Sequence, residues 1–147
     1  MNYLYDSSAI LNTVRTHGRH AYGLLKGGLT LSLARYEIGN ALWKEALLHK
    51  RISLQEALEA VVLLGKVLEV MRVVEPSDAG TVLTLAYELQ TTFYDASYIV
   101  AAAENGAKLV TDDEGLARKV KSDDATIAKM LGKRVEVLSS SEITRKV

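Results

Sequence analysis

Short apolar runs alternate along the chain with longer segments of mixed hydrophobic and polar residues. The short runs are rich in leucine, valine and tyrosine and end at polar or turn-forming residues, which is typical of buried strands. Strands are expected at residues 2–5, 29–32, 70–74, 108–111 and 134–138. The tail from Ser139 is polar and carries no predicted element.

The longer segments show helical spacing of apolar residues and helix-capping residues. Ser7 or Ser8 can cap the first segment, which Gly18 divides into two pieces, and Ser53 with Glu56 forms a capping box for another. Residues 94–104 are apolar nearly all round, which indicates a buried helix. Helices are expected at residues 9–26, 33–50, 53–69, 77–90, 94–104, 114–122 and 126–131.

The alternation of strands and helices predicts the fold class. It favours an α/β fold with three layers, α/β/α, around a mostly parallel central sheet. The length of 147 residues fits a single domain spanning residues 1–147. Ligand sites of such sheets lie at the carboxyl ends of the strands.

Composition and charge narrow the chemistry. The chain has no cysteine, which excludes thiolate metal sites and cysteine nucleophiles and fits a cytoplasmic protein. We expect neither a secretory signal nor a membrane helix, because no apolar run is long enough. Net charge is zero, but residues 1–51 carry four more basic than acidic residues, an asymmetry compatible with a polyanionic ligand.

Acidic residues follow two of the predicted strands. Asp6 ends the first strand, and Asp112 and Asp113 come directly after Thr111 at the end of the strand at 108–111. Asp95 instead opens the apolar helix, where the positive end of the helix dipole keeps a carboxylate ionised.

A fourth acid lies on the helix expected at 33–50. Glu37, Asn40 and Lys44 are spaced so that they share one helix face. Asn40 is therefore a candidate to hold the carboxylate of Glu37. Lys44, together with Arg15 and Arg19 nearer the N-terminus, is a candidate to contact the phosphates of a polyanionic ligand.

These acids would form a ligand set made only of oxygen if they converge. Hard divalent cations, Mg²⁺ or Mn²⁺, prefer such ligands. The chemistry that suits this set is metal-assisted hydrolysis of phosphodiester bonds. Sequence spacing alone does not establish that the acids meet.

Three motifs carry a family resemblance that covers nearly the whole chain. They are YLYDSSAIL at 3–11, LARYEIGNALWK at 33–44 and FYDASYIVAAAENGAKLVTDDEGL at 93–116, followed by the late strand RVEVL. In order and spacing they resemble a PIN domain, specifically a VapC-type toxin ribonuclease of a type II toxin–antitoxin pair. The third motif is the most specific.

The resemblance implies roles for individual residues. It implies an acidic quartet of Asp6, Glu37, Asp95 and Asp113, with Asp6 and Asp95 as metal ligands. Ser7 resembles a hydroxyl residue that supports the first acid, and Thr111 one that precedes the last. Asp112 occupies a variable position and is expected to face solvent, with at most a supporting role.

The resemblance also implies a Mg²⁺- or Mn²⁺-dependent endoribonuclease that forms a homodimer and binds an antitoxin. Alternatives are an RNA-processing PIN nuclease without an antitoxin and a Mg²⁺-binding phosphoacceptor domain. The latter needs a lysine on a late strand near the site, and Lys108 is badly placed because it starts its strand. A degenerate PIN domain that only binds is disfavoured by the presence of all four acids.

Overall fold

A parallel sheet lies at the centre of the computed structural model, which describes residues 2–144. Within that range the sheet has five strands in the order β3-β2-β1-β4-β5, and every neighbouring pair is parallel. The strands are β1 (Tyr3–Tyr5), β2 (Leu29–Thr30), β3 (Arg72–Val73), β4 (Lys108–Val110) and β5 (Val137–Leu138). The predicted parallel α/β sheet is therefore confirmed, with strands shorter than expected.

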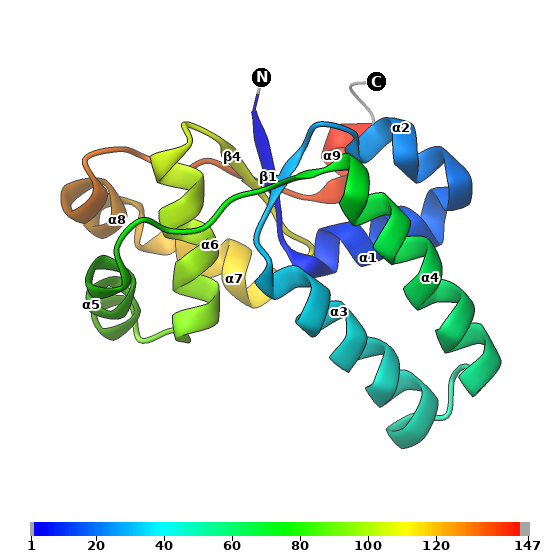
Figure 1. The fold of residues 1–147 in the computed structure, drawn as a ribbon. Coiled ribbons are helices and arrows are strands. Elements are labelled where there is room, and N and C mark those ends of the chain that lie inside the picture. The colour runs from blue at the N-terminus through cyan, green and yellow to red at the C-terminus, as the bar shows by residue number, and fades with distance from the viewer. Residues whose placement is uncertain (1, 145–147) are drawn as a thin grey trace.

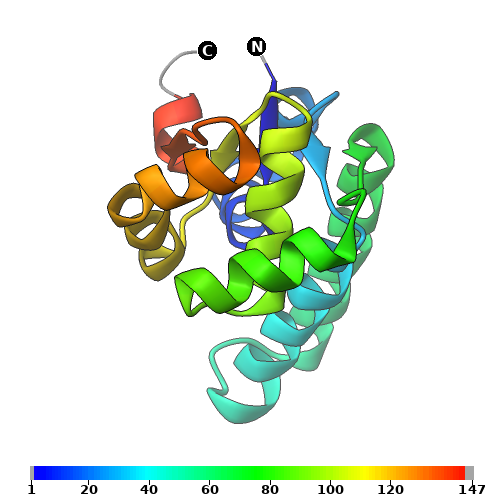
Figure 2. The same cartoon turned by 90° about the vertical axis from the view of Figure 1, so that its left-hand side faces the viewer.

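Helices cover both faces of this sheet (Figures 1 and 2). On one side lie α1 (Ser7–His17), α2 (Ala21–Leu25), α3 (Leu33–Trp43), α4 (Leu54–Val70) and α9 (Ser140–Thr144). On the other lie α5 (Ala79–Leu89), α6 (Phe93–Glu104), α7 (Glu114–Ser122) and α8 (Asp124–Leu131). The predicted three-layer arrangement is confirmed.

The pleat of the strands sends alternate residues into two separate cores. Leu4 and Leu109 pack into the core beneath α5–α8. Their neighbours Tyr5 and Val110 pack into the core beneath α1–α4 and α9. Because both faces are covered, β1 and β4 present apolar side chains on both sides of the sheet, as the short apolar runs indicated.

Helix α6 is buried along most of its length. Each residue from Ala96 to Ala103 is buried, which confirms the helix that was predicted as apolar nearly all round. Thr92 caps its start by accepting a hydrogen bond from the backbone N–H of Asp95 over 3.0 Å. The cap fixes Asp95 in the first turn, at the margin of the buried segment.

The helical hairpin of α3 and α4 extends away from the sheet. The single helix expected at 33–50 ends instead in a π-helical segment, η2 (Lys44–Leu48), and a left-handed Lys50. The capping box of Ser53 and Glu56 is present. The apolar stripe on α4 is only partly core, since Leu54 and Leu58 are 70% and 49% exposed.

The C-terminal segment differs from the expected polar tail. Residues Ser140–Thr144 form helix α9, and Ile143 is buried in the core beneath α1–α4. Ser139 and Glu142 exchange backbone-to-side-chain hydrogen bonds in a capping box, a spacing that the sequence displays. No helix in the described part of the chain is long and apolar enough to cross a membrane.

Candidate functional site

The carboxyl ends of the two central strands bring Asp6 and Asp113 to the same edge of the sheet. Strands β1 and β4 are paired in register, and the backbone N–H of Asp6 donates to the carbonyl of Val110 over 3.0 Å. Asp6 follows β1 directly, and Asp113 lies three residues beyond the end of β4.

Asp6 is a buried carboxylate held by three hydrogen bonds. It is the N-cap of α1, and its Oδ1 accepts from the backbone N–H of Ala9 at 2.9 Å and the hydroxyl of Ser8 at 2.7 Å. Its Oδ2 accepts from the hydroxyl of Thr111. The supporting hydroxyl is therefore that of Ser8; Ser7, the residue expected in this role, makes no hydrogen bond to Asp6.

Burial dominates the electrostatics of Asp6, which is only 4% exposed. Burial raises the pKa of Asp6 to about 6, the three hydrogen bonds oppose this rise, and the nearby carboxylate of Glu37 adds to it. None of the ion pairs between described residues involves Asp6, Glu37, Asp95 or Asp113. These charges therefore face one another without a Lys or Arg partner.

Glu37 is held by a residue from the opposite layer. The hydroxyl of Tyr98, on α6, donates to Oε1 of Glu37 over 2.7 Å. The prediction that Asn40 holds this carboxylate is wrong, since Asn40 is exposed and Glu37 bonds to Tyr98 instead. Tyr98 was missed because it lies within the apolar run of α6; its spacing of three from Asp95 was the available signal.

Asp95 faces two of the other acids from the first turn of α6. Burial raises the pKa of its carboxyl, and the carboxylates of Asp113 and Glu37 raise it further, against a hydrogen bond from Thr91. The structure thus places Asp95 within electrostatic reach of Asp113 and Glu37, and Glu37 within reach of Asp6.

Thr111 connects the first and last acids. Its hydroxyl donates to Asp6 and accepts from the backbone N–H of Asp113 over 3.0 Å. Asp113 is also the N-cap of α7, where Oδ1 accepts from the backbone N–H of Leu116 over 3.1 Å. The placement of Thr111 therefore matches the supporting position expected for it.

Asp112 is not solvent-facing as expected. Its Oδ1 accepts from the backbone N–H of Ser140 at 2.8 Å, and its Oδ2 accepts from the Ser140 hydroxyl at 2.5 Å and from the Asn12 amide at 2.9 Å. The carboxylate joins the β4–α7 connection to α1 and α9. Both of its oxygens therefore accept hydrogen bonds from protein donors.

The candidate basic residues are not gathered around the acids. Arg15 forms an ion pair with Glu45 near the C-terminal end of α1. Arg19 lies beyond that end, in the 3₁₀ turn η1 (Gly18–His20), whereas Asp6 caps the other end of this 11-residue helix, roughly 16 Å away along the axis. Lys44 is exposed at the start of η2.

The donor chemistry of the acids fits a hard divalent cation. All the candidate ligand atoms are carboxylate oxygens, and mutual repulsion of the carboxylates raises the pKa values of Asp6 and Asp95 beyond the effect of burial. No group of three or more His, Cys, Asp or Glu residues between positions 2 and 144 is arranged to hold an ion by itself. Mg²⁺ commonly takes only one or two carboxylates directly and completes its shell with water and phosphate, so a site for it does not require three such ligands.

Comparisons with known proteins agree with this fold. Residues 3–122 match the PIN domain. The chain is 38% identical over 121 residues to Exonuclease VapC9 of Pyrobaculum aerophilum, covering 82% of this chain and 87% of that protein. It is 37% identical over 94 residues to Ribonuclease VapC3 of the same organism, covering 61% and 69%.

A solved structure from the same organism has a similar fold. The crystal structure of PAE2754 from Pyrobaculum aerophilum superimposes with a TM-score of 0.68 at 32% identity, covering 90% of this chain and 97% of that one. The earlier resemblance is therefore confirmed. The chain belongs to the PIN-domain family and, within that family, to the VapC type.

Proposed function

We propose that this protein is a metal-dependent endoribonuclease and the toxin of a type II toxin–antitoxin pair. The observation that carries the proposal is the buried carboxylate of Asp6, which lies near Glu37 and has no Lys or Arg ion-pair partner among residues 2–144, at the edge that also holds Asp95 and Asp113. Such a concentration of negative charge is costly unless a cation compensates it. The VapC relatives, one named an exonuclease and one a ribonuclease, support nuclease chemistry.

Asp6 and Asp95 are the residues that would hold Mg²⁺ or Mn²⁺. When bound, such an ion supplies a water of lowered pKa and neutralises charge on the phosphate. Ser8, Thr111 and Ala9 orient Asp6, which leaves its carboxylate little rotational freedom.

Glu37 and Asp113, together with Asp6 and Asp95, make up what we call the acidic edge of the sheet. Tyr98 fixes the carboxylate of Glu37 by donating a hydrogen bond to it. Asp113 is oriented by capping α7 and by its backbone bond to Thr111. We propose that both acids position water and substrate.

The antitoxin would bind the apolar face of the α3–α4 hairpin. A cavity of about 410 Å³ opens there between α3, η2 and α4. Trp43, Leu47 and Leu54 line it and are 49%, 57% and 70% exposed. Exposed apolar surface of this kind is typical of a protein contact.

We also propose a homodimer, which light scattering of the purified protein would test.

Endonucleolytic cleavage is tested with a circular single-stranded RNA and a linear RNA of the same sequence. With Mg²⁺ or Mn²⁺, the protein should open the circle and cut the linear RNA internally. Cleavage of the linear RNA alone, by stepwise shortening from one end, would contradict the endonuclease assignment. Undiminished cleavage in EDTA after exhaustive dialysis would contradict the metal mechanism.

A further inference from the structure

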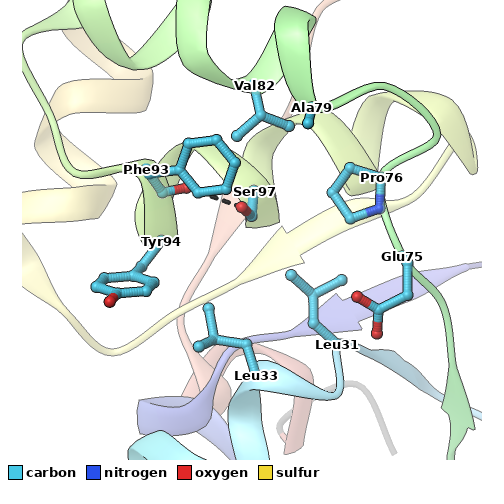
Figure 3. A pocket seen from close by; sticks show the side chains of 9 residues that line it. All are labelled: Leu31, Leu33, Glu75, Pro76, Ala79, Val82, Phe93, Tyr94 and Ser97. Carbon is cyan, nitrogen blue, oxygen red and sulfur yellow. Dashed lines mark hydrogen bonds between the residues drawn. The ribbon is translucent and has the colours of Figure 1, made fainter.

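A second cavity adjoins the acidic edge on the side of α5. It has a volume of about 290 Å³ and is open to solvent. Figure 3 shows Leu31 and Leu33 on one side of it, Glu75 and Pro76 on another, and the aromatic rings of Phe93 and Tyr94 opposite. Its volume is close to the lower limit of small-ligand pockets, roughly 300 Å³.

The walls of this cavity are continuous with the candidate catalytic residues. Tyr94 precedes Asp95 in the first turn of α6. Leu33 lies one helical turn before Glu37 on α3, and so on the same face. A group held in the cavity is thus positioned by the two helices that carry Asp95 and Glu37.

Aromatic rings and one carboxylate give the cavity its chemical character. Phe93 and Tyr94 are 43% and 58% exposed, so both rings are accessible to a ligand in the cavity. Glu75 is fixed at the rim because its Oε1 accepts a hydrogen bond from the backbone N–H of Ser32 over 3.0 Å. No ion pair with Glu75 exists among residues 2–144, so its carboxylate keeps lone pairs that can accept further hydrogen bonds.

We propose that this cavity binds one nucleobase of the RNA substrate, beside the phosphate that is cut, and prefers guanine. The proposal rests on the ribonuclease function above and names a specificity determinant for it. Exposed aromatic rings stack on unpaired bases. Guanine presents two adjacent N–H donors to a carboxylate, whereas the other three bases present a single group. The charge of Glu75 disfavours a phosphate in the same place.

Binding of mononucleotides tests the site without requiring cleavage. The 5′-monophosphates of guanosine, adenosine, cytidine and uridine are titrated in EDTA into the whole protein, and NMR follows the signals of Leu31, Leu33 and Phe93. We expect GMP to shift these signals and to bind several-fold more tightly than the other three. Glu75→Gln keeps the Oε1 that Ser32 contacts but should reduce the GMP preference about 10-fold.

Matched controls lie on α5 outside the cavity. Glu88→Gln should leave the GMP preference unchanged, since Glu88 is exposed elsewhere on that helix. Tyr94→Ala should weaken binding of all four nucleotides, whereas Tyr87→Ala should not, although Tyr87 is 80% exposed.

Three results would overturn the base site. They are no shift of these signals by any nucleotide, equal binding of all four nucleotides unaffected by Glu75→Gln, or conversion of a dimer to a monomer by Tyr94→Ala. The last would identify the cavity as a contact between two copies of the chain. Guanine-selective binding in a protein that cleaves no RNA would instead contradict the proposed ribonuclease function alone.

Discussion

The hydroxyl of Tyr98 donates a hydrogen bond to Oε1 of Glu37 over 2.7 Å and so joins α6 to α3 across the edge of the sheet. Tyr98 is 1% exposed, and both burial and the contact with Glu37 raise the pKa of its hydroxyl. The tyrosine therefore stays protonated and can donate this hydrogen bond to Glu37. The orientation of Glu37 depends on a residue that is itself immobilised by packing.

Tyr98→Phe should reduce RNA cleavage about 10-fold or more, because groups that orient an active-site carboxylate typically contribute at this level. The ring remains to fill the core, so the far-ultraviolet circular dichroism spectrum should not change. Tyr36→Phe is the matched control, because Tyr36 precedes Glu37 but is 72% exposed. Equal activity of both variants would show that the hydrogen bond to Glu37 has no role in catalysis.

Asp112→Asn and Asp113→Asn should have opposite consequences. Asp112 binds Ser140 and Asn12, so its neutralisation should lower the free energy of unfolding by about 1–2 kcal/mol and leave most of the activity. Asn is as good an N-cap as Asp, so Asp113→Asn should preserve stability while reducing cleavage strongly. Denaturant titration and a cleavage assay on both variants separate these effects. A larger loss of activity for Asp112→Asn would reverse the assignment.

The sequence predicted the positions of the acids better than their partners. Asp6 and the pair Asp112 and Asp113 were identified because they follow apolar runs that were predicted to be strands of one sheet, and the PIN resemblance selected Asp113 and Thr111. Ser8 rather than Ser7 holds Asp6, a choice that depends on where the cap turns the first residues of α1. A shift of one residue rotates a side chain by about 100° around a helix, and the pattern did not resolve it.

Contacts between residues far apart in the chain could not be predicted from the sequence pattern. Asp112 meets Ser140 28 residues later, and Glu37 meets Tyr98 61 residues later. Local spacing suggested Asn40 as the partner of Glu37, but the donor is Tyr98, a buried residue of the opposite layer. Helix α9 was not predicted, because Ile143 is its one buried residue and lies among serines and a glutamate.

Asp6→Asn should stabilise the metal-free protein at neutral pH. Burial raises the pKa of Asp6 from 3.8 to about 6, so its contribution to stability is fully present below pH 3.8 and is lost as the pH rises through about 6. The asparagine avoids this loss and keeps an oxygen for Ala9 and Ser8. In EDTA the variant should gain on the order of 3 kcal/mol relative to the wild type between pH 4 and pH 7. A variant less stable than the wild type at pH 7 would indicate that Asp6 serves only as a helix cap.

Mg²⁺ should raise the melting temperature of the wild type by mass action. A concentration of 100 times Kd stabilises the folded state by about 2.7 kcal/mol. Asp6→Asn and Asp95→Asn should each show a smaller rise, because each removes a proposed ligand. Thermal melts with EDTA and with millimolar Mg²⁺ provide the comparison. The same rise in all three proteins would place the ion elsewhere.

The central claim is that the acidic edge cleaves RNA through a metal ion, and cleavage of a labelled RNA by Asp95→Asn tests it most directly. With Mg²⁺ present, the variant should be about 100-fold or more slower than the wild type, with an unchanged circular dichroism spectrum. Asp124→Asn, the same change at a surface residue paired with Arg134, should retain wild-type cleavage. EDTA should stop cleavage by the wild type and by Asp124→Asn. Cleavage by Asp95→Asn at the wild-type rate, in a folded protein free of contaminating nuclease, would contradict the claim.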